Sequence, residues 1–183
     1  MMKSLILATL TAGLGSVATS TLAAPTNTWY GGVGFGITKM DDDVLTTNVS
    51  DDDLGWKLFG GYHLYNNLAI EGAWAALGEH KALTAQVKTS GFAIEAVGTV
   101  PLQDYLDIFG KLGGFMWSSD MTNTIASPTS KDDSGFDLTL GLGARWQLPK
   151  DMVQNLALRG EWEYFKAAQE IHMYSLGVEF QFQ

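Results

Sequence analysis

Residues 136–148 read FDLTLGLGARWQL and alternate strictly between two kinds of side chain. The even positions are all apolar: Phe136, Leu138, Leu140, Leu142, Ala144, Trp146 and Leu148. The odd positions hold no large apolar residue: Asp137, Thr139, Gly141, Gly143, Arg145 and Gln147. Because successive side chains of a strand point to opposite faces, this period of two predicts a strand with one apolar face and one polar or small face.

The same alternation recurs along the chain and predicts an all-β protein of eight strands. The strands are expected at residues 29–38, 56–63, 68–74, 92–100, 106–116, 136–148, 156–164 and 174–182. The connections are expected at 40–53, 65–67, 78–90, 101–105, 118–134, 149–155 and 166–170. A strand of roughly ten residues, tilted as in a membrane barrel, covers about 25 Å of bilayer height. The pattern therefore predicts an antiparallel up-and-down barrel with both termini on one side, the periplasmic side.

Eight alternating strands also fit a soluble lipocalin-like barrel with its apolar face turned inward, so the outer face has to be decided separately. Seven aromatic side chains occupy the apolar face near strand ends, as in the girdles at a lipid–water boundary. They are Trp29, Tyr62, Trp74, Trp146, Trp162, Tyr164 and Tyr174. The polar face is rich in glycine and holds charges of both signs, which suits the crowded inside of a narrow barrel. We therefore expect a transmembrane barrel with its polar face inward.

The first 24 residues have the features of a secretory signal peptide. Lys3 gives the positive end, residues 5–17 form an uncharged apolar run, and small residues follow. Cleavage is expected after Ala23 or Ala24, which leaves residues 25–183 as one barrel domain. The apolar run is short for a transmembrane helix, which needs about 20 residues.

Composition excludes several classes of function. The chain has no cysteine, so disulfides, thiolate metal sites and a cysteine nucleophile are excluded. Its net charge of −9 argues against nucleic acid as a partner, because phosphate contacts need clustered Lys and Arg. The aspartates at 41–43 and 51–53 lack the spacing of a calcium-binding loop. We expect a solvated loop there, and no cofactor or metal.

Several motifs resemble the OmpA-like transmembrane domain family of outer-membrane barrels. They are WYGG at 29–32, FGGY at 59–62, LDIFGKLGG at 106–114 and LRGEWEY at 158–164. The resemblance implies an eight-stranded barrel in the outer membrane of a Gram-negative bacterium, with roles in envelope integrity, surface contact and a disputed small pore. Two inner positions depart from the family pattern: Val97 stands where a base is common, and Arg145 where a carboxylate is common. The family's periplasmic domain is not expected in this chain.

The C-terminal strand resembles the signal read by the barrel-assembly machinery. Its pattern is polar, x, Gly, x, x, apolar, x, aromatic. The residues that match are Ser175, Gly177, Phe180 and Phe182. The resemblance therefore implies this machinery as a partner, although Gln183 follows the terminal aromatic residue.

Inward-facing charges are the best candidate site. The expected network comprises Glu71, Glu95, Lys111, Arg145, Arg159 and Glu161. An unpaired charge inside a narrow barrel is costly, so opposite signs are expected to pair, with Glu71, Arg145, Arg159 and Glu161 at the core. The network predicts either an ion-paired plug or a gated conduction path.

The function expected is structural, or a surface interaction through extracellular loops, by a monomer in contact with outer-membrane lipid and lipopolysaccharide. A ligand or host contact through these loops is left open. A narrow pore for ions or small solutes is the first alternative. A lipid A-modifying enzyme at the rim is the second, because His80 and His172 fall near Ser90, Ser118 and Ser119 at the predicted extracellular side. No nucleophile motif or orienting aspartate accompanies them, so no enzyme activity is expected.

Overall fold

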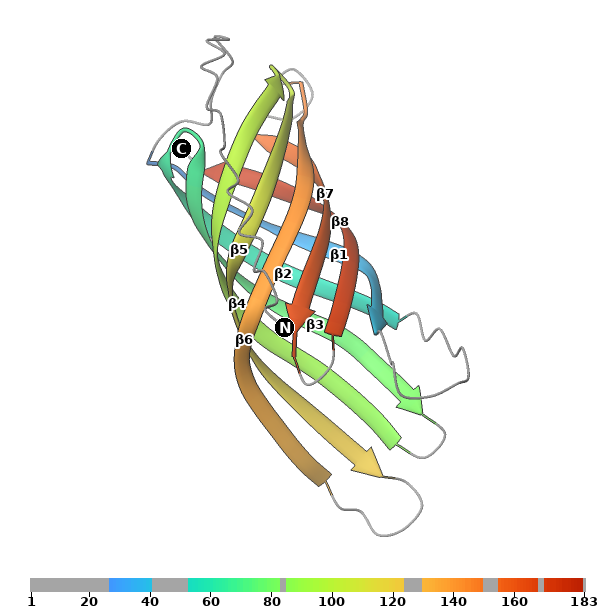
Figure 1. Ribbon diagram of the computed structural model, residues 1–183. Helices are drawn as coiled ribbons and strands as arrows, with labels where there is room; N and C mark the ends of the chain where they lie inside the picture. Colours follow the sequence, from blue (N-terminus) through green and yellow to red (C-terminus); the bar gives the residue numbers. More distant parts are fainter. Residues whose placement is uncertain are drawn as a thin grey trace, which may run out of the picture.

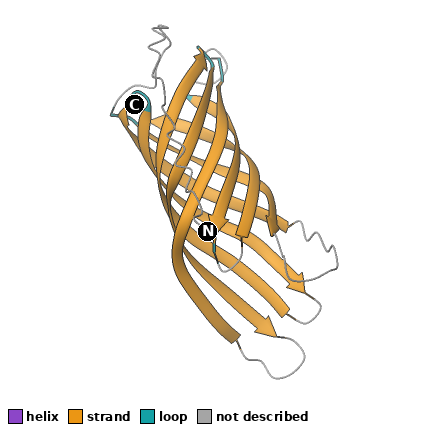
Figure 2. Ribbon diagram, viewed as in Figure 1, coloured by secondary structure: helices purple, strands orange, loops and turns teal. Residues whose placement is uncertain are grey.

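The computed structural model describes residues 27–40, 53–82, 85–123, 130–149, 155–167 and 170–182 (Figure 1). The expected signal peptide and most of the first acidic loop lie outside these ranges. In the described part every regular element is a strand, as Figure 2 shows. No helix in these ranges is long and apolar enough to cross a bilayer.

Eight antiparallel strands close into a barrel, in which each strand pairs with the next and β8 pairs with β1. They are β1 (Trp29–Met40), β2 (Asp53–Tyr65), β3 (Leu68–Ala82), β4 (Ala85–Gln103), β5 (Leu106–Asn123), β6 (Ser130–Gln147), β7 (Leu156–Lys166) and β8 (Glu170–Phe182). The all-β, eight-stranded prediction is confirmed. Because the barrel is closed, the backbone N–H and C=O groups of each strand pair with a neighbouring strand. A β-protein in lipid requires this, since the hydrocarbon core offers no hydrogen-bond partners.

The barrel has two different ends. The start of β1 and the end of β8 lie together at one end, the terminal end, with the two-residue turns at 66–67 and 104–105. The opposite end, the loop end, lies toward the bottom of Figure 1. There β3 to β6 run beyond the ends of the other four strands.

Two of the predicted loops are wrong, because most of their residues belong to strands. Of the expected loop 78–90, β3 includes the residues up to Ala82 and β4 those from Ala85. Of the expected loop 118–134, β5 continues to Asn123 and β6 begins at Ser130. Alternating hydrophobicity reports only the part of a strand that separates lipid from lumen. A polar strand that projects into water keeps its backbone ladder but loses that pattern.

The predicted turn at 101–105 is also shorter than expected. Pro101 and Gln103 belong to β4, with a register shift between them, and only residues 104 and 105 form the turn. A proline lacks the backbone N–H, so a strand tolerates it at an irregular position near its end. The same kind of irregularity occurs in β3 between Ala76 and Glu79, where Gly78 has a φ of +92°.

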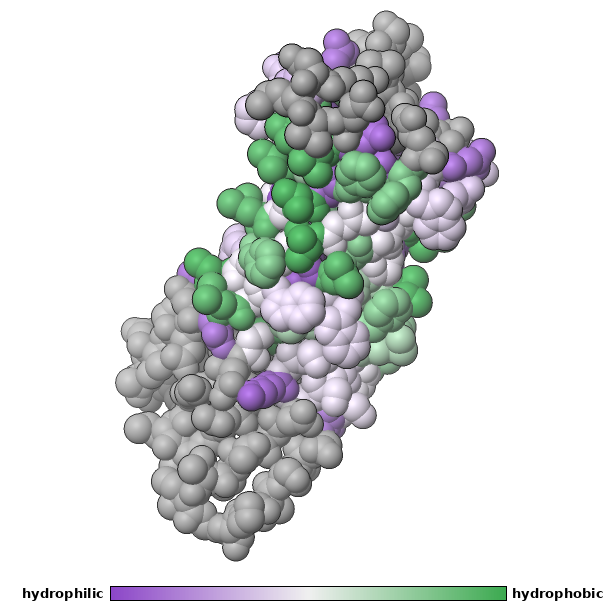
Figure 3. All heavy atoms as spheres, turned by 180° about the vertical axis from the view of Figure 1, so that it is seen from behind, coloured by the Kyte–Doolittle hydropathy of each residue, from purple (hydrophilic) through white to green (hydrophobic). Residues whose placement is uncertain are grey.

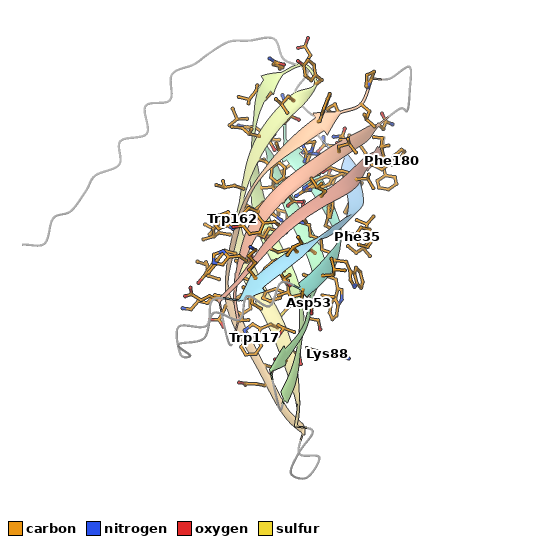
Figure 4. The ribbon with its side chains drawn as sticks, turned by 90° about the vertical axis from the view of Figure 1, so that its right-hand side faces the viewer. Phe35, Asp53, Lys88, Trp117, Trp162 and Phe180 are labelled. Atoms are coloured by element: carbon orange, nitrogen blue, oxygen red, sulfur yellow. The ribbon has the colours of Figure 1, made fainter. Side chains whose placement is uncertain are left out.

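The polar and small face lines the lumen, and the apolar face forms the outer wall. Arg145 and Glu71 have no exposed surface, whereas Leu176 is 77% and Phe136 is 71% exposed. Figure 3 shows apolar side chains over the outer wall, and Phe35 and Phe180 project from it in Figure 4. The predicted orientation of the two faces is therefore confirmed.

Glycine on the inner wall makes room for neighbouring backbone. A Cβ atom added to Gly113 would lie 2.0 Å from the carbonyl oxygen of Ile94 on β4. A Cβ atom added to Gly32 would lie 2.2 Å from the carbonyl oxygen of Val178 on β8. The strands can therefore approach and coil at these points only without a side chain.

Candidate functional site

Nine charged side chains fill the middle of the lumen, and we call them the plug. They are Lys57, Glu71, Glu95, Lys111, Arg145, Arg159, Glu161, Glu163 and Glu179. Seven strands, β2 to β8, contribute to it. Each of these side chains is at most 2% exposed, so their charges are withdrawn from water and must be balanced within the barrel.

The pair of Arg159 and Glu71 lies at the centre of the plug. Arg159 donates from Nη1 to Oε2 of Glu71 at 2.8 Å and from Nη2 to Oε1 at 3.0 Å, a bidentate arrangement. The hydroxyl of Tyr30 also donates to Oε2 of Glu71, at 2.9 Å. Arg159 Nε lies 2.7 Å from Oε1 of Glu161. Bidentate, charge-assisted bonds of this kind fix the geometry of both partners.

Two aromatic rings lie close to the guanidinium of Arg159. Its Cζ atom lies 4.3 Å from the ring centroid of Phe59 and 4.4 Å from that of Phe109. A planar cation over aromatic faces is attracted by the ring quadrupole, and more strongly when water is absent. The guanidinium of Arg159 is therefore surrounded by both carboxylates and aromatic rings.

Lys111 is the second centre of the plug. Its Nζ atom lies 3.0 Å from Glu95, 3.1 Å from Glu161 and 3.3 Å from Glu71, and it also contacts Glu163. A single ammonium group therefore joins carboxylates from three strands, β3, β4 and β7.

Lys57 reaches the same carboxylates from β2. Its Nζ atom lies 2.8 Å from Oε1 of Glu161, and it donates a hydrogen bond to Glu163. Each of these two glutamates of β7 therefore has more than one cationic partner.

Arg145 joins the plug differently from the expectation. Its Nε atom lies 2.9 Å from Oε1 of Glu179, and Nη1 lies 3.8 Å from Asp107 toward the terminal end. It is linked to the centre because Glu179 also accepts a hydrogen bond from Arg159 at 3.0 Å. The resemblance places a carboxylate where Arg145 stands. A base is accommodated here because Glu179 and Asp107 face it.

An apolar layer closes the lumen between the plug and the loop end. It consists of Leu77, Phe115, Phe165, Ile171 and Met173, all at most 1% exposed. The rings of Phe115 and Phe165 pack with centroids 4.7 Å apart. Nearer the loop end, Trp117 donates from its indole nitrogen to Asp137 at 3.0 Å. An ion crossing this lumen would have to displace both layers.

The six site residues predicted from sequence all lie in the plug, and the structure adds Lys57, Glu163, Glu179 and Tyr30. The six comprise three acidic and three basic residues. Their charges therefore balance, and charge pairing alone gave no reason to expect further residues in the network. The additional residues could have been included from strand parity alone, because each stands at an inward position of its strand.

The structure does not bring His172 together with the serines considered with it. His172 lies on the outer wall beside Trp162 and Tyr164, with ring centroids 5.8 Å and 5.2 Å away. Ser90 and Ser118 pair with each other in register on β4 and β5. The side chain of His80 lies outside the described residues. Within the described ranges no group of three or more potential metal ligands occurs.

The residues that resemble the assembly signal lie on both faces of β8. Ser175 and Gly177 face the lumen, whereas Phe180 and Phe182 face outward with ring centroids 5.2 Å apart. The two aromatic side chains lie in the outer wall at the terminal end. Their position leaves them accessible from the membrane side.

The sequence model of the family described as OmpA-like transmembrane domain matches residues 24–182. The outer membrane protein A of Klebsiella aerogenes is 28% identical over 186 residues, which cover 92% of this chain and 53% of the relative. That of Klebsiella pneumoniae is 29% identical and covers 87% of this chain and 53% of the relative. The chain thus spans about half the length of the curated relatives it matches.

Solved outer-membrane barrels share the fold at low sequence identity. Neisserial surface protein A has a TM-score of 0.68 at 13% identity, covering 84% of this chain and 97% of that chain. Ail, the attachment invasion locus protein of Yersinia pestis, has a TM-score of 0.63 at 16% identity, covering 86% of this chain and 100% of that chain.

Proposed function

The chain belongs to the OmpA-like transmembrane domain family of outer-membrane barrels, and from this premise we propose that it is a closed, non-conducting barrel that holds surface loops in the outer membrane. Its role is structural, or a contact made through those loops, and no catalytic role is proposed for its described residues. The observation that carries this proposal is the double closure of the lumen by the plug and by the apolar layer.

The charge pattern of the plug supports closure over conduction. A conducting path needs sites that an ion can enter and leave, lined by water or by groups that replace its hydration shell. Here the carboxylates already bind fixed cationic side chains, and the apolar layer offers Phe115 and Phe165 in place of polar ligands. Moving an ion through would break buried pairs, each of which is expensive to separate.

We place the terminal end in the periplasm and the loop end at the cell surface. Two of the three connections at the terminal end are two-residue turns, at 66–67 and 104–105, and the third, between β6 and β7, spans 148–155. The two short turns support this orientation, because outer-membrane barrels have short periplasmic turns and longer outer loops. The loop end carries the longer connection between β1 and β2 and the projecting parts of β3 to β6. Outer-leaflet lipid and lipopolysaccharide would surround that end.

A surface contact is proposed for the loop end, and assembly by the barrel-assembly machinery through β8. Ail has also been solved in complex with sucrose octasulfate, a heparin analogue. A small barrel of this fold can thus bind a ligand. For this chain we propose a monomer whose loop chemistry differs, because three aspartates occur at 41–43 and three at 51–53.

Single-channel recording tests the closed-barrel proposal. The chain refolded without residues 1–24 would be added to a planar lipid bilayer, with folding shown by a shift in gel mobility on boiling. The expected result is a silent bilayer with folded protein. Discrete current steps that change in size in Glu71→Gln would contradict the proposal and favour a narrow pore lined by the plug.

A further inference from the structure

The charges of the plug do not balance. It contains four cationic side chains, Lys57, Lys111, Arg145 and Arg159, and five carboxylates, Glu71, Glu95, Glu161, Glu163 and Glu179. All nine are almost fully buried, so bulk water cannot screen the excess negative charge. An uncompensated charge in such a place is strongly unfavourable, and a buried carboxyl group tends to be neutralised instead.

Neighbouring groups do not supply the missing positive charge. Asp107, near the terminal end of the plug, would add a further negative charge and lies 3.8 Å from Arg145. His63 is buried beside Tyr30, with ring centroids 4.9 Å apart, and among the described residues neither of its ring nitrogens has a hydrogen-bond partner. An imidazolium there would hold two buried N–H groups without acceptors, close to an arginine, and would be disfavoured.

Lys111 shows where the imbalance is concentrated. Its ammonium group has three hydrogens, yet four carboxylates lie around it, those of Glu71, Glu95, Glu161 and Glu163. Three N–H groups cannot each serve a different one of four carboxylates, so one of the four receives no hydrogen bond of its own from Lys111.

Glu95 is the carboxylate with the fewest cationic partners. Its Oε2 accepts from Lys111 at 3.0 Å, and no second cation contacts it among the described residues. Each of the other four plug carboxylates contacts at least two cations. The remaining contact of Glu95 is neutral, because its Oε1 accepts from the hydroxyl of Thr139 at 3.4 Å.

We propose that Glu95 is a proton-binding site, occupied in the folded barrel at neutral pH. The proton lies on Oε1, and the hydroxyl of Thr139 on β6, which faces this oxygen, turns to accept it, while Oε2 accepts from Lys111 on β5. Glu71 on β3, opposite Glu95 in register, and Glu163 on β7 disfavour a second negative charge there. With Glu95 neutral, four carboxylates face four cations. The inference rests on the burial of the plug and not on the surface role proposed above.

A bound metal ion is a poorer explanation than a proton. Within the described residues, no three or more His, Asp or Glu side chains form a group that could hold a metal ion. The carboxylates nearest to Glu95 already bind Lys111, Lys57 or Arg159. A proton needs only one acceptor, and a hydroxyl such as that of Thr139 can accept as well as donate.

The proton makes stability depend on pH with a definite sign. In the unfolded chain Glu95 is ionised near neutral pH. The folded barrel then holds one proton more than the unfolded chain, so the free energy of unfolding falls as pH rises. The fall continues until Glu95 loses its proton in the folded state. Glu95→Gln keeps a neutral side chain of similar shape and removes this dependence.

Urea unfolding of the barrel in lipid vesicles tests the proposal, with Glu163→Gln as the matched control. From about pH 6 to about pH 9, the ratio of the unfolding constants of wild type and Glu95→Gln should rise by up to about tenfold per pH unit. Glu95→Gln should be at least as stable as wild type at neutral pH. Glu163→Gln removes a carboxylate with two cationic partners and should be less stable than wild type at neutral pH. A loss in Glu95→Gln equal to that in Glu163→Gln would overturn the proposal.

Infrared spectroscopy of the wild-type barrel provides an independent readout if a variant fails to fold. A protonated carboxyl band should be present at neutral pH and disappear on alkaline titration. Absence of the band would refute a protonated Glu95. A wild-type stability that depends on replacing sodium with a bulky organic cation at constant pH would also refute it, because a metal ion would then balance the charge.

Discussion

Arg159 shows how much a single residue can determine in a dry lumen. It binds Glu71 through two nitrogens, contacts Glu161 and Glu179, and lies over the rings of Phe59 and Phe109. None of these contacts alone would be worth much in water. Together, and without solvent, they make this residue hard to replace, because its removal leaves several carboxylates short of a partner.

Arg159→Ala is therefore expected to lower the free energy of unfolding by about 3–5 kcal/mol. The physical reason is the loss of the cation that Glu71 binds most closely, which leaves an uncompensated buried charge. The urea midpoint of the refolded barrel in vesicles measures the effect. Lys166→Ala, at an exposed position of β7, is the control and should leave the midpoint almost unchanged. An unchanged midpoint in Arg159→Ala would contradict the plug as a stabilising unit.

Gly113→Ala is expected to be destabilising by about 1–3 kcal/mol, because the new methyl group would meet the backbone oxygen of Ile94 at 2.0 Å. A backbone atom in a closed ladder cannot move aside as a flexible side chain can. Gly98→Ala is a matched control: its Cβ atom would meet nothing within 4 Å. The same unfolding measurement on both variants separates crowding in the lumen from a general effect of glycine replacement. Equal midpoints would show that the inner wall can accommodate a methyl group at Gly113.

At the scale of the strands, alternation in the sequence predicts the strand segments that lie in lipid and misses the segments that project into water. The central part of each of the eight strands could be located because one face had to be apolar, as it is from Phe136 to Trp146 in β6. The projecting ends of β3 to β6 could not, because both of their faces tolerate polar residues. In the plug, parity places Lys57, Glu163 and Glu179 on the inner wall, but which acid meets which base depends on strand stagger, which one sequence does not reveal.

The projecting part of β5 can be tested by proline substitution. Ser118 pairs with Ser90 on β4 and with Ser134 on β6, so it lies in a ladder on both sides. Proline there removes a backbone donor and is tolerated poorly in an inner strand, so a loss of at least about 1 kcal/mol is expected. Ser118→Thr, which favours strand geometry, is the control and should be neutral. Equal stability of the two variants, measured by urea midpoint, would indicate a loop at this position, as the alternation alone predicts.

At the scale of the whole molecule, charge separates this barrel from one that would bind polyanions. The chain has a net charge of −9 and two aspartate triplets, one at 41–43 after β1 and one at 51–53 that ends at the first residue of β2. A sulfated polysaccharide is attracted by clustered Lys and Arg and repelled by carboxylates, and the repulsion is screened as salt rises. Binding of a sulfated ligand, as in the complex of Ail with sucrose octasulfate, is therefore not expected for this barrel.

A heparin column in 0.15 M salt, an ionic strength with a Debye length of about 8 Å, should not retain the folded barrel. Replacing all six aspartates with asparagine removes six negative charges and should weaken the repulsion expected at low salt. Saturable retention of the wild-type barrel would show that basic side chains at the loop end dominate the local field despite the net charge, and the surface contact would then have to be sought among polyanions.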